Sequence, residues 1–298
     1  MWKIAPILPL RLMHSQPIPE QIYFDVLGLR LVAQRWNNGG IPVIALHGWL
    51  DNSESFAQLA LAMPNVDLVA LDMAGHGHSD HRVVHANYLI WDDFREILAV
   101  ADQLGWQRFG LLGHSRGAII AALLTSAMPE RIRALGLIDG LWAQTTQAAQ
   151  TPMQIADSLR AESLKKPARV YASLDEMVAQ RQRYGFPLAN EAATCITLRN
   201  AVQHSEGQWS WRTDPRLRVP SLMRLTPEQM DACHRAISVP TELCLAEQGL
   251  VQAYPDYAER LLALPQVSWT VHAGGHHLHM EGAQSILGQA FNSFFQRL

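Results

Sequence analysis

Residues 109–128 read FGLLGHSRGAIIAALLTSAM, and this stretch decides the fold. The apolar residues 109–112 predict a buried strand, and the apolar run 118–128 predicts a helix. Between them, Gly113 and Gly117 flank Ser115 in the pattern G-x-S-x-G. Side chains at the two flanking positions would collide where a strand turns sharply into a helix, so both are glycine. The stretch therefore predicts a strained strand-to-helix turn with Ser115 at its apex.

The alternation of strand and helix continues on both sides of this stretch. Short apolar runs alternate with segments of helical periodicity, and turn signals such as residues 37–40 separate them. This order implies βαβ units and a mostly parallel sheet, so we expect an α/β fold. We expect strands at 22–26, 29–35, 43–46, 67–72, 109–112, 134–138, 241–246 and 267–272, and helices at 56–63, 92–104, 118–128, 257–264 and 283–295.

The alternation stops between residues 141 and 240, where the sequence is helical in character and holds no convincing buried strand. We therefore predict a core domain, residues 1–140 and 241–298, and an inserted helical cap (lid), residues 141–240. Ligands bind at the carboxyl edge of such sheets, and we expect the cap to cover that edge. The cap has a net charge of +3 and the rest of the chain −6. A solvated helical surface explains this difference; the functional alternative is a preference for anionic or carboxylate-bearing substrates.

The composition is that of a globular protein. Of 298 residues, 48% are hydrophobic and 17% are charged, which argues against intrinsic disorder. The net charge of −3 argues against a nucleic-acid partner. Cys195, Cys233 and Cys244 are too widely spaced for a disulfide framework or a zinc pattern, which favours a reducing compartment.

No segment has the character of a membrane span or a targeting signal. The longest apolar run, 117–124, is far shorter than the ~20 residues that a membrane span needs. Residues 1–12 are apolar, but Pro6 and Pro9 interrupt them and no clear cleavage site follows. We therefore expect a cytoplasmic protein with no membrane span.

Ser115 is the candidate nucleophile, and a histidine-rich segment supplies the candidate base. A serine hydroxyl is too weak an acid to attack a carbonyl unaided, so it needs a base poised near neutral pH. Residues 274–281, GGHHLHME, follow the last expected strand. His276 comes directly after the glycine pair, where a loop can lift its imidazole over the strand ends to the serine. We expect His279 to be a packed or hydrogen-bonded histidine.

The same segment raises the alternative of a metal site. His272, His276, His277 and His279 cluster in the sequence, but they have no known ligand spacing and no partner cysteine pair. We therefore expect no metal.

The carboxylate that orients the base is ambiguous in the sequence. It stands between the serine and the histidine in chain order. The loop after the penultimate expected strand has no aspartate, and Glu247 is its nearest carboxylate, very close to the strand end. Asp139 lies at the end of the strand before the insertion, where its structural alternative is a turn-forming residue before Gly140. We favour Asp139, with Glu247 as the alternative and Asp256 as a further candidate.

Two backbone N–H groups are candidates for an oxyanion hole. The segment His47-Gly48-Trp49 follows an early buried strand. We assign the N–H groups of Trp49 and of Arg116, the residue after the serine. We expect Gly48 to leave room for the substrate. The Trp49 side chain either lines the acyl pocket or serves as a core or lid contact.

Taken together, these motifs resemble the α/β-hydrolase superfamily over nearly the whole chain. The resemblance rests on His47-Gly48, Gly113 to Gly117, Gly275-His276 and residues 72–80, DMAGHGHSD, which are similar to the D-x-x-G-x-G-x-S-D loop of that superfamily. Residues 47–52, HGWLDN, 101–106, ADQLGW, and 276–280, HHLHM, resemble its serine-hydrolase-like branch. The resemblance implies a mostly parallel eight-stranded sheet, an inserted helical cap, a Ser/acid/His triad and no cofactor.

The chain departs from the superfamily pattern at two positions. The acid after the penultimate strand is missing, and some relatives, including haloalkane dehalogenases, place it after the preceding strand, where Asp139 stands. Arg116 stands where many relatives have a smaller or apolar residue, so its side chain needs a partner. Dehalogenases and epoxide hydrolases use an aspartate nucleophile, and Ser115 argues against those reactions.

The sequence therefore predicts a carboxylesterase-like serine hydrolase that acts on a small, apolar, ester-like substrate through an acyl-enzyme. The resemblance implies Ser115 as nucleophile, His276 as base, and Trp49 and Arg116 as oxyanion donors. Acyltransferases, thioesterases and lactonases share this apparatus. An alternative of another class is a ligand-binding protein on the same scaffold with weakened catalysis. The apolar cap residues that indicate an apolar substrate group are Trp142, Met153, Ile155, Trp209 and Trp211.

Overall fold

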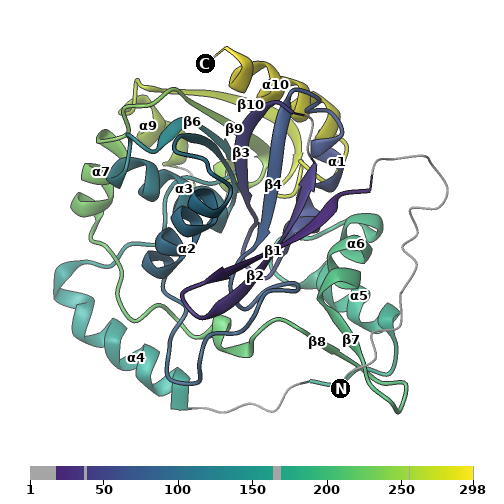
Figure 1. Ribbon diagram of the computed structural model, residues 1–298. Helices are drawn as coiled ribbons and strands as arrows, with labels where there is room; N and C mark the ends of the chain where they lie inside the picture. The colour runs from purple at the N-terminus through teal and green to yellow at the C-terminus, as the bar shows by residue number, and fades with distance from the viewer. Residues whose placement is uncertain (1–17, 37–38, 164–168, 255, 298) are drawn as a thin grey trace.

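Eight strands form one sheet at the centre of the molecule (Figure 1). The computed structural model describes residues 18–36, 39–163, 169–254 and 256–297, so the apolar segment 1–12 lies outside the described residues. The order across the sheet is β1-β2-β4-β3-β5-β6-β9-β10. The strands span Glu20–Val26 (β1), Leu29–Trp36 (β2), Ile41–Leu46 (β3), Val66–Asp72 (β4), Phe109–His114 (β5), Ile132–Ile138 (β6), Thr241–Gln248 (β9) and Val267–Gly275 (β10).

Most neighbouring strands of the sheet are parallel. β2 pairs antiparallel with β1 and with β4, and all other neighbouring pairs are parallel. Every residue of β4 and of β5 is buried, as expected for strands that are covered on both faces. The prediction of an α/β fold with a mostly parallel eight-stranded sheet is confirmed.

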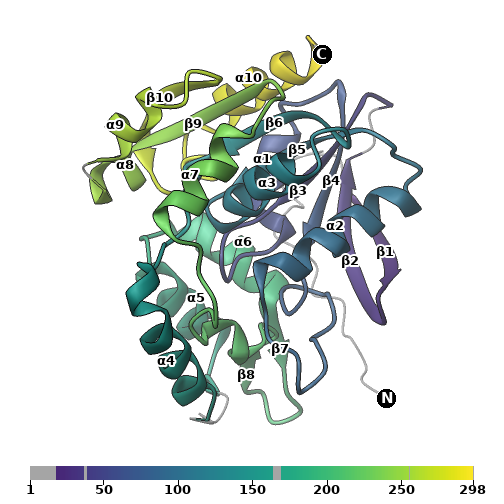
Figure 2. The same ribbon diagram turned by 90° about the vertical axis from the view of Figure 1, so that its left-hand side faces the viewer.

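Helices cover both faces of this sheet (Figures 1 and 2). Leu111 of β5 packs in one apolar core with Ile120 of α3, whereas the next residue, Leu112, packs in a second core with Phe291 of α10. Successive side chains of a strand point to opposite faces, so β5 contributes to both cores. The helices outside residues 141–240 span Ala57–Ala60 (α1), Ile90–Gln103 (α2), Arg116–Ala127 (α3), Leu250–Ala253 (α8), Tyr257–Leu262 (α9) and Gln284–Gln296 (α10).

No helix of the described ranges is long and apolar enough to cross a membrane. The cytoplasmic location stays a prediction.

Residues 141–240 are called the insert below, and part of the insert packs on the loops that follow β3 and β4. The side-chain amide of Asn52 donates to the carbonyl of Ile196 (2.9 Å), and the N–H of Gly77 donates to Oδ1 of Asn200 (2.9 Å). The division into core and cap stays a prediction, because α7 of the insert shares an apolar core with α3. The insert contains α4 (Thr151–Ser163), α5 (Leu174–Arg183), α6 (Asn190–Asn200), β7 (Ala201–Gln203), β8 (Trp209–Trp211) and α7 (Pro227–Arg235).

Two local predictions are wrong. The insert is not purely helical, because β7 and β8 pair as an antiparallel hairpin; each strand has three residues, too few to give a recognisable apolar run. The helix expected at 56–63 is a single 3-10 turn, Ser53–Phe56, followed by the short α1. It ends early because the N–H groups of Ala62 and Met63 donate to carbonyls three residues back, and the following proline has no N–H.

A buried ion pair joins the insert to the end of β4. Arg199 of α6 contacts the Asp72 carboxylate through Nε (3.0 and 3.1 Å) and Nη2 (2.7 Å). The N–H groups of Ser53 and His78 also donate to this carboxylate (2.8 and 2.9 Å). Burial alone raises the pKa of Asp72, but the Arg199 guanidinium and these N–H groups hold the pKa below its ordinary value. The carboxylate is therefore ionised, and its charge is balanced by an insert residue.

Removal of Arg199 is expected to be strongly destabilising. Arg199→Met leaves the buried Asp72 charge without its counter-ion, which costs about 3–5 kcal/mol in the free energy of unfolding. The double variant Asp72→Asn/Arg199→Met should recover part of this loss. Urea unfolding measures both. Arg297→Met is the control, since it removes an exposed partner of Glu242 and should change stability by about 0.5 kcal/mol or less. Equal losses in Arg199→Met and Arg297→Met would contradict the interpretation.

Carboxylates of α2 meet two arginines beside the start of α3. Arg82 Nη2 lies 2.7 Å from Glu96 Oε1 and 3.3 Å from Asp93 Oδ1, and Arg116 Nη2 lies 2.6 Å from Asp93 Oδ2. Both carboxylates are buried. Burial and the neighbouring Asp93 charge raise the pKa of Glu96 to about 7, although Arg82 opposes this shift. Glu96 therefore titrates near neutral pH.

This pKa shift predicts how stability depends on pH. The folded protein holds the Glu96 proton up to about pH 7, whereas the unfolded chain releases it at the ordinary pKa of ~4.3. The contribution of Glu96 to stability is thus fully present below the unfolded pKa and is lost as pH rises through 7. Glu96→Gln cannot lose a proton, so its Tm relative to the wild type should rise between pH 5 and pH 8.5. The exposed Glu259→Gln should show no such trend; parallel curves for the two variants would refute the shift.

Candidate active site

The backbone of Ser115 makes the turn that the sequence predicts. Ser115 follows the last residue of β5 and precedes the first residue of α3, with φ of 51° and ψ of −116°. Positive φ is unfavourable for a residue with a Cβ and persists only where the surroundings enforce it. Here the N–H of Ser115 donates to the carbonyl of Ile138 at the end of β6 (3.0 Å). The turn therefore holds Ser115 at the carboxyl end of the strands.

The glycines on either side of Ser115 allow close contact of backbones. A Cβ on Gly117 would lie 2.0 Å from the carbonyl oxygen of Leu46 in β3. A Cβ on Gly113 would lie 2.4 Å from the Cα of Ala118. Both distances are far below van der Waals contact, so any larger residue would push α3 away from the sheet. The two glycines are thus required by the packing of this helix.

Ser115, His276 and Asp139 form one hydrogen-bonded chain. Ser115 Oγ lies 2.9 Å from His276 Nε2, and His276 Nδ1 lies 2.5 Å from Asp139 Oδ2. The three residues come from three segments: the turn after β5, the end of β6 and the loop after β10. His276 and Asp139 are buried. The carboxylate accepts from Nδ1, which leaves Nε2 as the nitrogen that can accept the serine proton.

Backbone N–H groups of β9 and of the start of α8 hold the Asp139 carboxylate. The N–H of Ala246 donates to Oδ1 (3.0 Å), and the N–H of Leu250 donates to Oδ2 (3.1 Å). A Cβ on Gly249 would lie 2.2 Å from Oδ2, so glycine is needed beside the carboxylate. The loop in which the resemblance led us to expect an acid thus supplies N–H donors and space for Asp139. Gly249 is the sequence feature that could have favoured Asp139 over Glu247 and Asp256, but its role becomes visible only in the structure.

The other candidate acids lie elsewhere. Glu247 is an exposed residue of β9, and Asp256 is an exposed residue directly before α9. Within the described residues, Asp139 is the carboxylate that contacts the His276 ring.

The His47 ring orients the peptide that carries the Trp49 N–H. His47 Nδ1 donates to the Gly48 carbonyl (2.7 Å), and Nε2 accepts from the N–H of Met73 (3.1 Å). The carbonyl and the N–H of one planar trans peptide point in opposite directions, so the Trp49 N–H is turned away from His47. The other candidate donor, the Arg116 N–H, belongs to the first turn of α3, where amides have no partner within the helix. The oxyanion roles of both N–H groups stay predictions.

The Arg116 side chain has the partner that its position requires. Its guanidinium donates to Asp93 of α2 (2.6 Å) and contacts the Met73 sulfur (3.6 Å). It therefore points away from Ser115, towards the cluster on α2.

Aromatic residues of the insert cover this region. The Phe186 ring centroid lies 4.0 Å from that of His276. Trp49 Nε1 donates to the carbonyl of Leu217 (2.9 Å), and its ring lies 6.0 Å from that of Tyr184. Trp49 is therefore a contact between the core and the insert.

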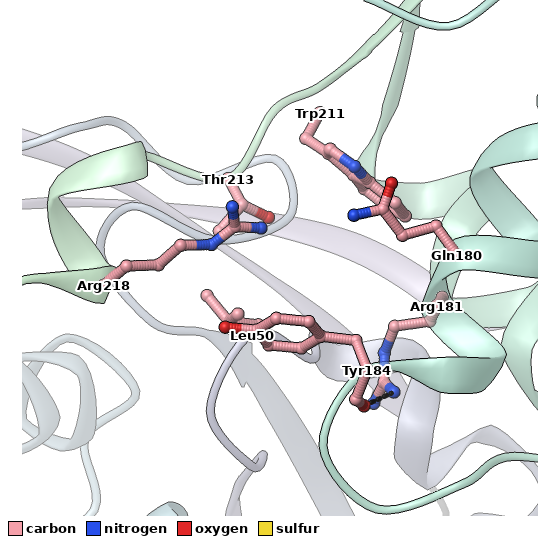
Figure 3. A pocket seen from close by; sticks show the side chains of 7 residues that line it. All are labelled: Leu50, Gln180, Arg181, Tyr184, Trp211, Thr213 and Arg218. Atoms are coloured by element: carbon pink, nitrogen blue, oxygen red, sulfur yellow. Dashed lines mark hydrogen bonds between the residues drawn. The ribbon is translucent and has the colours of Figure 1, made fainter. Parts of the chain in front are cut away.

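A pocket opens between the insert and the loop after β3 (Figure 3). Of the five apolar residues expected beneath the cap, Trp211 lines this pocket, whereas Trp142 packs in the core against Tyr257 (4.7 Å between ring centroids) and Met153 is exposed. The pocket is lined by Leu50, Gln180, Arg181, Tyr184, Trp211, Thr213 and Arg218.

Gly48 has a further reason to be glycine. A Cβ there would lie 2.8 Å from Asp51 Oδ2 and 2.9 Å from His114 Nδ1. Both groups are buried, and Asp51 is paired with Arg181 of α5 (2.5 Å). The sequence analysis missed this ion pair, because its partners lie 130 residues apart.

The four histidines near the C-terminal end of the sheet do not form one group. The His272 ring contacts Thr270 on β10 (2.9 Å). His277 and His279 instead gather with His276 around the buried His114. His279 is fully buried, as expected for a packed histidine.

Comparison with known proteins places the chain in a family. The family model described as the alpha/beta hydrolase fold matches residues 41–213. A serine hydrolase-like protein of Danio rerio is 28% identical over 274 residues, which cover 86% of this chain and 82% of the relative. The crystal structure of a hypothetical protein from Pseudomonas aeruginosa PAO1 is 42% identical, covers 93% of this chain and 100% of that one, and has a TM-score of 0.90.

A thioesterase domain from the curacin biosynthetic pathway is alike in fold, with 22% identity, a TM-score of 0.80, and coverage of 94% of this chain and 100% of that one. The fold, the motifs and the family model agree. The chain therefore belongs to the α/β-hydrolase family and resembles its serine hydrolase-like members.

Proposed function

We propose that this protein is a serine hydrolase that cleaves a carboxylic ester or a related carbonyl compound through an acyl-enzyme. The observation that carries the proposal is the hydrogen-bonded chain from Ser115 through His276 to Asp139 (2.9 and 2.5 Å). A nucleophile, a base and a carboxylate that orients the base are the groups that this reaction needs.

In the first half-reaction, Ser115 Oγ attacks the substrate carbonyl carbon while its proton passes to His276 Nε2. The buried Asp139 carboxylate accepts from Nδ1 and stabilises the imidazolium. The N–H groups of Trp49 and Arg116 stabilise the negative oxygen of the tetrahedral intermediate. The imidazolium then gives its proton to the leaving oxygen, and the ester bond breaks.

In the second half-reaction, water attacks the acyl-enzyme. His276 Nε2 takes a proton from the water, and the tetrahedral intermediate collapses as the proton returns to Ser115 Oγ. The products are a carboxylic acid and regenerated enzyme. We propose that the insert acts as a cap over this site, since Phe186 and Tyr184 lie against His276 and Trp49.

The pocket beside Leu50 supports a substrate with an apolar group. Leu50, Tyr184 and Trp211 provide apolar lining, and the exposed Arg218 guanidinium lies 5.4 Å from the Tyr184 ring centroid. This positive group supports the alternative that a carboxylate-bearing ester is preferred. Thioester cleavage, lactone cleavage and acyl transfer use the same groups and remain alternatives within this proposal.

One observation favours a second candidate, a ligand-binding protein with weak turnover. The Phe186 ring covers the His276 ring, and the His276 side chain is only 4% exposed. A site covered in this way can bind a ligand without turning it over. Covalent reactivity of Ser115 separates the two candidates.

A fluorophosphonate probe tests the nucleophile and its base. We expect one adduct per chain, mapped to Ser115 by peptide mass spectrometry, because His276 activates this hydroxyl. Ser115→Ala should give no adduct, and His276→Ala should slow labelling by roughly three orders of magnitude or more. Thermal unfolding controls for the fold of each variant. Folded wild-type protein that is inert to the probe and to p-nitrophenyl esters of graded acyl length would favour the ligand-binding candidate.

Paired substitutions test the acid. Asp139→Asn should lower kcat by roughly 10³–10⁴-fold, since the neutral amide cannot stabilise the imidazolium or select its tautomer. Glu247→Gln is the matched control, and its kcat should stay within about threefold of the wild-type value because an exposed residue away from the reacting atoms has little effect. The assignment fails if the two variants exchange these results.

A further inference from the structure

A buried cluster of polar side chains lies against the His276 ring. It consists of Asp51, His114, His277 and His279, all at most 4% exposed. Among the described residues, Nδ1 of His114, Nδ1 of His277 and both ring nitrogens of His279 have no hydrogen-bond partner. Buried polar atoms without partners are rare and costly, so this cluster needs an explanation.

The tautomer of His114 is determined by its one partner. His114 Nε2 lies 2.9 Å from the carbonyl oxygen of His276, which can only accept, so Nε2 carries the proton. With the ring proton on Nε2, the neutral tautomer presents a lone pair at Nδ1.

This lone pair faces another acceptor. His114 Nδ1 lies 3.8 Å from Asp51 Oδ2. The other carboxylate oxygen, Oδ1, lies 2.5 Å from Arg181 Nη2. His277 Nε2 lies 3.5 Å from the same Oδ2. Arg181 balances the carboxylate charge from Oδ1, and a cation between His114 Nδ1 and Oδ2 would remove the repulsion that remains between these two acceptors.

The three donor atoms have the spacing of a metal site. His114 Nδ1, His277 Nε2 and a carboxylate oxygen of Asp51 all lie within 4.8 Å of one another. A tetrahedral Zn²⁺ with bonds of about 2.0–2.2 Å keeps its ligand atoms roughly 3.3–3.6 Å apart. The two distances to Asp51 Oδ2, 3.5 and 3.8 Å, are close to this range, whereas the third pair, His114 Nδ1 and His277 Nε2, lies within 4.8 Å. Binding would therefore draw the two rings towards each other.

We propose that Asp51, His114 and His277 form a binding site for a divalent transition metal of the Zn²⁺ class. Two imidazoles and one carboxylate form a ligand set that suits Zn²⁺, and its close relatives Co²⁺ and Ni²⁺. The contact from His114 Nε2 to the His276 carbonyl is the outer hydrogen bond that metal-binding histidines commonly make. It fixes the ring with Nδ1 towards Asp51.

Arg181 limits the affinity of this site and marks its access. Its Nη2 lies 3.4 Å from His277 Nε2, so its charge opposes a metal ion bound beside it. Arg181 and Leu50, the residue before Asp51, both line the pocket of Figure 3. We expect a metal ion to reach the site past the Arg181 side chain.

Occupancy of the site affects the neighbouring base. The ring centroids of His114 and His277 lie 4.8 and 5.1 Å from that of His276. A bound dication opposes positive charge on His276, so it slows every step that forms the imidazolium. This consequence rests on the proposed serine hydrolase function; metal binding itself does not.

The test is direct metal binding to chelator-treated, full-length protein. We expect one Co²⁺ per chain with the visible absorption of a tetrahedral site, and Zn²⁺ should displace it. His277→Gln and His114→Gln should each weaken the Kd at least about tenfold, since each removes a ligand. His272→Ala is the matched control and should leave the Kd unchanged, because this ring lies apart on β10. Binding by Ser115→Ala should equal that of the wild type, which keeps the result independent of hydrolase activity.

Two results would overturn the proposal. One is the absence of saturable Co²⁺ or Zn²⁺ binding to folded wild-type protein at millimolar metal. The other is metal binding that is lost in His272→Ala but retained in a folded His114→Gln or His277→Gln variant. A Zn²⁺-dependent rise in Tm provides a second readout: the wild type and His272→Ala should show it, and whichever ligand variant folds should lose it.

Discussion

The strained backbone at Ser115 is the constraint on which the rest of the site depends. A residue with positive φ stays in place only because two well-packed elements, β5 and α3, hold its ends. Their contact requires glycine at positions 113 and 117, where backbones meet without side chains between them. The same turn places the hydroxyl at the sheet edge and the start of α3 beneath it. The packing of α3 on the sheet and the position of the Ser115 hydroxyl therefore both depend on this turn.

Charge ties α5 and α6 of the insert to the core. The apolar clusters of this part, such as the one that contains Ile196, are separate from the two cores of the sheet, whereas α7 shares a core with α3. Arg199 and Arg181 pair with two buried carboxylates of the core, Asp72 at the end of β4 and Asp51 in the loop after β3. Such pairs contribute little net stability when formed, yet they cost much when one partner is lost. They therefore specify where α5 and α6 lie.

The sequence predicted the sheet and the pairing of Ser115 with His276, and it favoured Asp139 as the acid while leaving Glu247 and Asp256 open, because these inferences depend on local signals. An apolar run marks a buried strand, and the chain order places its end at a known edge. It did not predict the partners of Asp51 and Asp72, which depend on how a distant helix packs. The β7–β8 hairpin was missed because three-residue strands leave no periodicity. The cluster around His114 was missed as well, since His114 looked like a variable position within the G-x-S-x-G motif.

The contact between Gly249 and Asp139 has an evolutionary consequence. A side chain at position 249 and the carboxylate at position 139 compete for one volume, because a Cβ on Gly249 would lie 2.2 Å from Asp139 Oδ2. A lineage with this architecture can thus carry the carboxylate on either strand end, but not a bulky residue at both. Exchange between the two arrangements therefore requires substitutions at both positions. In related sequences, positions 139 and 249 should vary together.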